Sequence, residues 1–153
     1  MNTLVNMINS KNITFFDEQD HLDKNDILDC MGNLLHQSGF VKESYTQAIK
    51  NRESVFPTGL NTTTVGIAIP HTDSKHVREA TIAIGILKSP VIFQEMGADE
   101  IEVPVRLVFM LAIKEPEKQL ETLQSVISLI EDEEKMNALV HIENESDVIH
   151  LLS

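Results

Sequence analysis

Three short apolar runs constrain the fold of this chain more than any other feature of its sequence. The runs are Val65–Ile69, Ile82–Leu87 and Val105–Ile113. Each is almost continuously apolar, whereas a strand with one face in water would alternate apolar and polar residues. The pattern therefore predicts strands that are covered by helices on both faces. Ile13–Phe16 predicts a shorter strand near the start, and Val91–Phe93 is a candidate strand extension.

A helix is expected over residues 24–37, with Asp20 or Asp23 as its N-cap and Gly39 at its end. The only cysteine, Cys30, lies on the expected apolar side of this helix, so we expect a buried structural thiol. A single cysteine also excludes an intrachain disulfide and a zinc site built from cysteines.

Two further helical patterns flank the second half of the apolar runs. One begins near Lys42 and stops at Phe56–Gly59, which places Arg52 at a helix end beside a turn. Pro116 opens the other, an amphipathic helix. Its expected inner face carries Leu120, Leu123, Ile127 and Ile130. Two shorter helices are expected over 132–140 and 146–152.

The order of one strand, two helices, three strands and three helices predicts an α/β fold, a three-layer α/β/α sandwich with a mixed sheet. No repeat, low-complexity tract or linker interrupts the pattern, so we expect residues 1–153 to form a single domain. No apolar run approaches the roughly 20 residues of a membrane span. The amino-terminal residues lack the pattern of a signal peptide, so a cytoplasmic location without direct membrane insertion is expected.

The charge of the chain bears on its partners. Its formal net charge is -12 at pH 7. Nucleic acid is not an expected partner, because binding to it relies on Lys and Arg that neutralise phosphates. Acidity can instead steer association with basic proteins, although it also serves solubility.

One histidine is delivered into a polar loop by a stiff apolar segment. Gly66–Ile69 reads as a buried strand, and Pro70 fixes its own φ and restricts Ile69 to extended geometry. His71 follows directly. Its neutral imidazole could act as a nucleophile or bind a metal. The alternative is a histidine that only caps a turn at the strand end.

Motifs of several enzyme classes are missing. The sequence has no Gly-x-Ser-x-Gly elbow, no P-loop and no Rossmann glycine fingerprint. His71 and His76 lie close together, but not at the His-x-x-x-His spacing that places both on one helix face, so no metal is expected. His76 is interpreted as a polar surface residue, as are His21, His36, His141 and His150.

Phosphoryl transfer to His71 remains as a chemistry that the neighbouring residues could support. A histidine that accepts a phosphoryl group needs cationic or N–H donors around the phosphate oxygens. Arg52, Thr58 and the backbone of Gly59 could supply them, since Arg suits bidentate phosphate contact and Gly permits a close approach. Arg52 could equally be a solvated residue at a helix end.

Several segments carry a family resemblance in combination. They are Arg52-Glu53, Phe56–Leu60, Gly66–His71, Leu107–Ala112 and Gln119-Leu120. Together they resemble the enzyme IIA proteins of the sugar phosphotransferase system, in the fructose/mannitol superfamily. The resemblance covers nearly the whole chain.

The resemblance implies a phosphocarrier. In that family the motif histidine accepts a phosphoryl group from phosphohistidine-HPr and passes it to a cysteine of enzyme IIB, which works with the membrane enzyme IIC. His71 would then be the acceptor through Nε2, and Arg52 would stabilise the phosphate. No cofactor is implied, and phosphoenolpyruvate would be the ultimate donor. Because the chain has neither an enzyme IIB-like cysteine loop nor a membrane span, it is expected to be a separate subunit.

Gln119 departs from the pattern of many mannitol- and fructose-type members, which carry a second histidine at this position. A glutamine amide can donate a hydrogen bond to phosphate but cannot carry a proton charge. Gln119, together with Phe56–Gly59, resembles the galactitol-specific branch. Alternatively, Gln119 is an exposed helix residue without a role in transfer.

Two functions of other classes stay open at this point. One is a regulatory module of the same fold that binds a target protein according to the phosphorylation state of His71. The other is a metal-dependent hydrolase, which predicts bound metal and loss of activity with a chelator.

Overall fold

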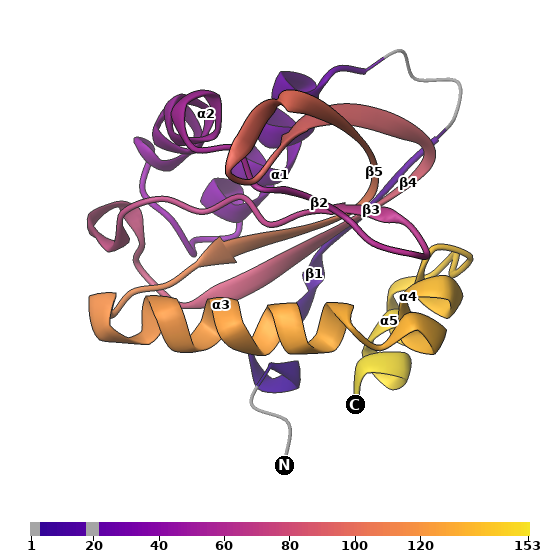
Figure 1. The fold of residues 1–153 in the computed structure, drawn as a ribbon. Coiled ribbons are helices and arrows are strands. Elements are labelled where there is room, and N and C mark those ends of the chain that lie inside the picture. Colours follow the sequence, from indigo (N-terminus) through magenta and orange to yellow (C-terminus); the bar gives the residue numbers. More distant parts are fainter. Residues whose placement is uncertain (1–3, 18–21) are drawn as a thin grey trace.

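The computed structural model describes residues 4–17 and 22–153. Its strands are β1 (Ile8–Phe16), β2 (Gly59–Asn61), β3 (Gly66–Ala68), β4 (Thr81–Glu95) and β5 (Ala98–Ala112). Its α-helices are α1 (Lys24–Gln37), α2 (Tyr45–Val55), α3 (Pro116–Ile130), α4 (Glu133–Leu139) and α5 (Glu145–Leu152). Short 3-10 turns at Val5–Met7 (η1) and Ser74–His76 (η2) complete the order shown in Figure 1.

The sheet is mixed, as expected. β4 pairs in parallel with β1 and antiparallel with β5, while β5 pairs in parallel with β3, and β3 antiparallel with β2. β4 and β5 form a long hairpin that turns at Gly97, whose φ is 78°. The hairpin curls over (Figure 1), so that Glu95 near its tip pairs with Gly59 of β2.

Both faces of the sheet are buried, which confirms the three-layer α/β/α sandwich. In β4, Ile82, Ile84 and Ile86 pack in a core with residues of α3, α4 and α5. Ala83 and Leu87 point the other way, into a core shared with α1 and α2. Because strand residues alternate between faces, a strand covered on both sides needs apolar residues at every position. This explains the continuous apolar runs in the sequence.

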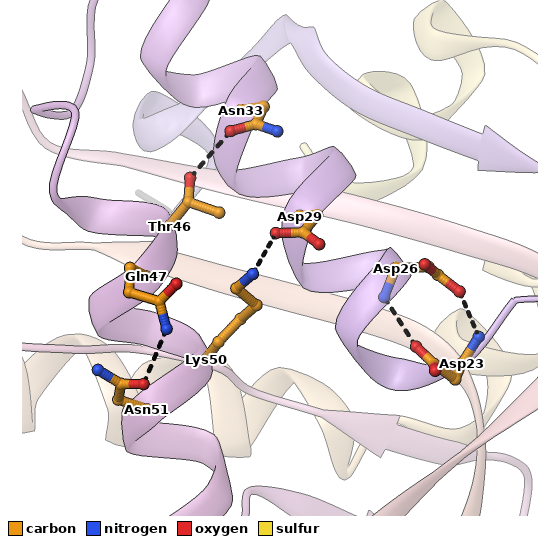
Figure 2. Close-up of polar contacts among 8 residues, drawn as sticks. All are labelled: Asp23, Asp26, Asp29, Asn33, Thr46, Gln47, Lys50 and Asn51. Carbon is orange, nitrogen blue, oxygen red and sulfur yellow. Dashed lines mark hydrogen bonds and ion pairs between the residues drawn. The ribbon is translucent and has the colours of Figure 1, made fainter.

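The two helices of one outer layer, α1 and α2, are held together by polar contacts on their outer surfaces (Figure 2). Lys50 forms an ion pair of 2.7 Å with Asp29, and the Thr46 hydroxyl donates to the Asn33 side chain at 3.3 Å. Asp23 caps α1 in a reciprocal pair of hydrogen bonds with Asp26. Such caps satisfy N–H groups that the first turn leaves without a partner.

Most boundaries expected from the sequence are confirmed. α1 spans residues 24–37, Asp23 is its N-cap, and Gly39 follows it with a φ of 86°, a conformation that favours glycine. The alternative cap, Asp20, lies outside the described residues. α2 begins at Tyr45 rather than near Lys42. The short strand β2 was not foreseen.

Two expectations about buried side chains are wrong. Cys30 is exposed, because Ile27, Met31 and Leu35 define the inner face of α1 and Cys30 lies on its flank. The inner face of α3 is likewise rotated from the expected one: Thr122, Val126 and Ile130 are buried, and Leu123 and Ile127 are partly buried. Leu120 is 64% exposed, which matters below because it lies beside Gln119.

Substitution of Gly66 tests the close approach between β3 and β5. A Cβ at this position would lie 2.1 Å from the carbonyl oxygen of Pro104, a backbone atom that cannot rotate away. We expect Gly66→Ala to lower the free energy of unfolding by about 1–3 kcal/mol or more, measured by urea denaturation. Gly32→Ala is the matched control, because its new Cβ meets only the side chain of Thr46. Equal stability of the two variants would contradict this packing.

Candidate active site

His71 lies in the loop that follows β3, and backbone contacts hold this loop from both sides. The N–H of Leu111 on β5 donates to the carbonyl oxygen of Pro70 at 2.9 Å. The N–H of Ile69 donates to the hydroxyl oxygen of Thr58 at 3.1 Å. The loop is therefore fixed immediately before His71, and the imidazole itself is partly buried.

Hydrogen bonding fixes the protonation of the His71 ring. Its Nδ1 lies 2.8 Å from the carbonyl oxygen of Ile69, which can only accept, so Nδ1 carries the hydrogen. In the neutral ring Nε2 then holds the free electron pair. Burial lowers the pKa of His71, the positive charge of Arg52 lowers it further, and the bond to Ile69 opposes both. The ring therefore stays neutral to a lower pH than an ordinary histidine, as a nucleophile requires.

Arg52 supplies a positive charge beside this imidazole. It lies in the last turn of α2, and its guanidinium carbon stacks 4.7 Å from the centre of the Phe56 ring. Within residues 4–17 and 22–153, Lys50 with Asp29 is the one ion pair, so no carboxylate in that part of the chain occupies the Arg52 guanidinium. A stacked guanidinium without a carboxylate partner is available to an incoming anion.

Thr58 has a different role from the expected phosphate contact. Its backbone N–H donates to Glu53 Oε2 at 2.8 Å, and its hydroxyl donates to Glu53 Oε1 at 2.9 Å. Both residues are 2% exposed. Burial raises the pKa of Glu53, while the two bonds from Thr58 and the charge of Lys24 oppose that shift. The donors of Thr58 are therefore used within the protein, where they tie the end of α2 to the strand before His71.

Gly59 is likewise required by packing. A Cβ there would lie 2.6 Å from the carbonyl oxygen of Gln94. Its own carbonyl accepts a hydrogen bond of 2.8 Å from the Met96 N–H. These contacts account for a glycine at this position without any ligand.

Gln119 contacts the loop of His71 from the first turns of α3. Its side-chain Nε2 donates to the carbonyl oxygen of Thr72 at 2.9 Å, and Thr72 follows His71 directly. The amide oxygen Oε1 is buried without a hydrogen-bond partner. The residue at the position of the second histidine therefore holds the loop, and it is not the fully exposed residue of the alternative interpretation.

Two residues that support the site were not found from the sequence. Glu53 was noted only as part of a family motif, and its burial against Thr58 depends on tertiary structure. Tyr45 was noted only as part of a helical pattern. It is fully buried and donates from its hydroxyl to the carbonyl oxygen of Leu111 at 2.8 Å, on the residue that anchors Pro70.

Exposed apolar side chains flank the same segments. Val55 and Phe56 are 65% and 59% exposed just after Arg52, and Leu120 is exposed beside Gln119. We name Val55, Phe56 and Leu120 the apolar rim.

The structure also bears on metal binding and on membranes. In the described part of the chain, no three His, Cys, Asp or Glu side chains are grouped as metal ligands. No helix among the described residues has the length and apolar character to cross a bilayer.

The electrostatic effect on His71 can be measured directly. We expect its imidazole to titrate below the value of about 6.5 for an unperturbed histidine, because burial and Arg52 both disfavour the charged form. Arg52→Gln should raise this pKa, while Lys135→Gln on α4 should leave it in place. Long-range proton–nitrogen NMR spectra over a pH series give the midpoint and the tautomer. A hydrogen on Nε2 rather than Nδ1 in the neutral ring would contradict the geometry.

The chain matches the family model described as "Phosphoenolpyruvate-dependent sugar phosphotransferase system, EIIA 2" over residues 6–153. It is 29% identical over 119 residues to the PTS system galactitol-specific EIIA component of Escherichia coli K12, covering 78% of this chain and 79% of that protein. It is also 32% identical over 127 residues to the transcriptional regulator ManR of Bacillus subtilis, covering 83% of this chain and 18% of the regulator.

A solved structure agrees in fold. It is the complex of enzyme IIAMTL and phosphorylated enzyme IIBMTL from Escherichia coli, with a TM-score of 0.76 and 25% identity, covering 95% of this chain and 96% of that chain. The resemblance expected from the sequence, including the likeness to galactitol-specific proteins, is confirmed. With a family model that spans all but its first few residues, the chain belongs to the EIIA 2 family of the phosphoenolpyruvate-dependent sugar phosphotransferase system, whose members are phosphotransferases.

Proposed function

We propose that this protein is a phosphocarrier that accepts a phosphoryl group on His71 from phosphohistidine-HPr and passes it to a cysteine of a cognate enzyme IIB. The observation that carries the proposal is the state of the His71 ring. Its Nδ1 hydrogen is held by the Ile69 carbonyl, so Nε2 offers its electron pair beside the unpaired guanidinium of Arg52.

The proposed transfer balances as follows. The Nε2 electron pair of His71 forms a bond to phosphorus while the bond between phosphorus and the donor imidazole breaks, and that imidazole keeps the electron pair. The phosphorylated ring retains its Nδ1 hydrogen on the Ile69 carbonyl. Arg52 stabilises negative charge on the phosphate oxygens. In the second transfer, a thiolate of enzyme IIB attacks the same phosphorus and His71 regains its Nε2 electron pair.

Both partners would dock over the apolar rim, because the transferred group lies between the two reacting atoms in each step. Val55, Phe56 and Leu120 expose apolar surface on the two helices that supply Arg52 and Gln119. Basic residues of HPr would meet the acidic surface of this chain. Since the partners must exchange on one surface, each complex should be small and short-lived.

The likeness to galactitol-specific EIIA supports a galactitol-type sugar for the complete system. The sugar would be selected by the membrane enzyme IIC rather than by this subunit. The carrier itself would act in the cytoplasm and without a cofactor.

The similarity to ManR of Bacillus subtilis favours one second candidate function. In that case the chain is a regulatory module that binds a target protein according to the phosphorylation state of His71. Onward transfer to an enzyme IIB separates the carrier from the module, because a module would retain its phosphate when enzyme IIB is added.

The first test is phosphorylation with phosphoenolpyruvate, enzyme I and HPr, followed by intact-mass measurement at neutral to alkaline pH. We expect one phosphate on His71, none on folded His71→Ala, and a rate lower by about a hundredfold for Arg52→Gln, since one charged donor is lost. His76→Ala, a change in the same loop, should accept phosphate normally. Phosphate on His71→Ala, or none on the wild type beside an active control IIA, would refute the assignment.

Gln119 provides a second test. Gln119→Glu replaces the donor to Thr72 with a carboxylate oxygen, which repels that carbonyl and the phosphate, so we expect acceptance to slow by about tenfold or more. Gln119→His keeps an N–H donor and should retain most of the rate. Initial rates and urea denaturation are compared for both variants. Equal rates for the two would show that the bond to Thr72 has no influence on transfer.

A further inference from the structure

A second feature of the sheet lies away from His71, where both strand ladders of β5 are interrupted at one residue. On one side Gly66 pairs with Val105 and Ile67 with Leu107, so Arg106 is skipped. On the other side Val105 pairs with Val91 and Leu107 with Ile86, so residues 87–90 of β4 face Arg106 alone. A bulge of this kind turns one side chain out of the regular alternation.

The bulge borders an open groove against the connection between α4 and α5. Cavities of about 490 and 370 Å³ share Arg106, Val140 and His141, so the two are one groove with Arg106 at its centre. Lys88 from the bulged segment of β4 also lines it. The combined space lies within the range of small-molecule sites.

Arg106 is held in place but its charge is not paired. Its Nε donates to the carbonyl oxygen of Leu87 at 3.0 Å, which fixes the plane of the guanidinium and leaves its terminal N–H groups. Although the chain has twice as many acidic as basic residues, no carboxylate of residues 4–17 and 22–153 forms an ion pair with Arg106 or Lys88. Bending of the hairpin accounts for the bulge, but it does not require a cation there.

The remaining lining is rich in hydrogen-bond acceptors. His141 donates from Nδ1 to the Asn137 carbonyl at 3.1 Å, which leaves Nε2 as an acceptor in the neutral ring. Asp17 and Glu143 also line the groove. These groups would repel a second anionic group on a ligand, and they would accept hydrogen bonds from hydroxyls.

We propose that this groove binds a small phosphorylated polyol, with its phosphate on Arg106 and Lys88 and its hydroxyls on His141, Asp17 and Glu143. A planar guanidinium with free N–H groups suits phosphate oxygens. The groove lies beside the Gly66 end of β3, whereas His71 follows the opposite end of that strand. The site is therefore separate from the one proposed for phosphoryl transfer and can be tested without it.

The test is an NMR titration of the uniformly nitrogen-labelled full chain at constant ionic strength with glycerol phosphate, the smallest probe of this class. We expect saturable amide shifts at residues 87–90 and 140–143. Methyl phosphate, which lacks hydroxyls, should bind at least about tenfold more weakly, and glycerol should not bind measurably. Equal affinity for methyl phosphate, or shifts that do not saturate, would overturn the proposal.

Matched variants separate the groove from general attraction to cations. Arg106→Gln should weaken binding of glycerol phosphate by about tenfold or more. Lys88→Gln should weaken it too, and because Lys88 is exposed this change leaves the bulge intact. Arg78→Gln, the same change at an exposed arginine outside the groove, should bind as the wild type does. Wild-type affinity in both groove variants would refute the assignment.

Discussion

The buried carboxylate of Glu53 is the contact on which the geometry around His71 depends. It accepts both donors of Thr58, and the Thr58 hydroxyl oxygen in turn accepts the N–H of Ile69. One helix end, one turn and one strand end are thereby joined by three hydrogen bonds in a place without water access. Because a buried carboxylate without these donors would be costly, the network fixes the backbone that aims the imidazole.

Three elements that are distant in sequence bring their side chains to the same loop. α2 contributes Arg52, the segment after β3 contributes His71, and α3 contributes Gln119. In each case a backbone carbonyl sets the orientation: Ile69 for the imidazole and Thr72 for the amide. The protein therefore prepares the proposed acceptor nitrogen before any partner binds, so that positioning accounts for much of the expected rate.

The sequence predicted the features that depend on local pattern and missed those that depend on packing. The buried strands and α1 follow from apolar periodicity and capping, and the stiff approach to His71 follows from Pro70. The partner of the Thr58 hydroxyl could not be predicted, because Glu53 reaches it only after α2 has packed on the sheet. Cys30 and Leu120 were misplaced because a helical face estimated from a few apolar residues can be rotated by one neighbour.

The curl of the long hairpin has a consequence for the behaviour of this protein in a crowded solution. Fifteen-residue strands with exposed edges would offer backbone groups to other chains and favour aggregation. Here β3 covers the outer edge of β5, and the pairing of Gly59 with Glu95 closes β2 over the hairpin tip. A protein that must meet several partners in turn thus exposes side chains to them while withholding its longest strands from indiscriminate pairing.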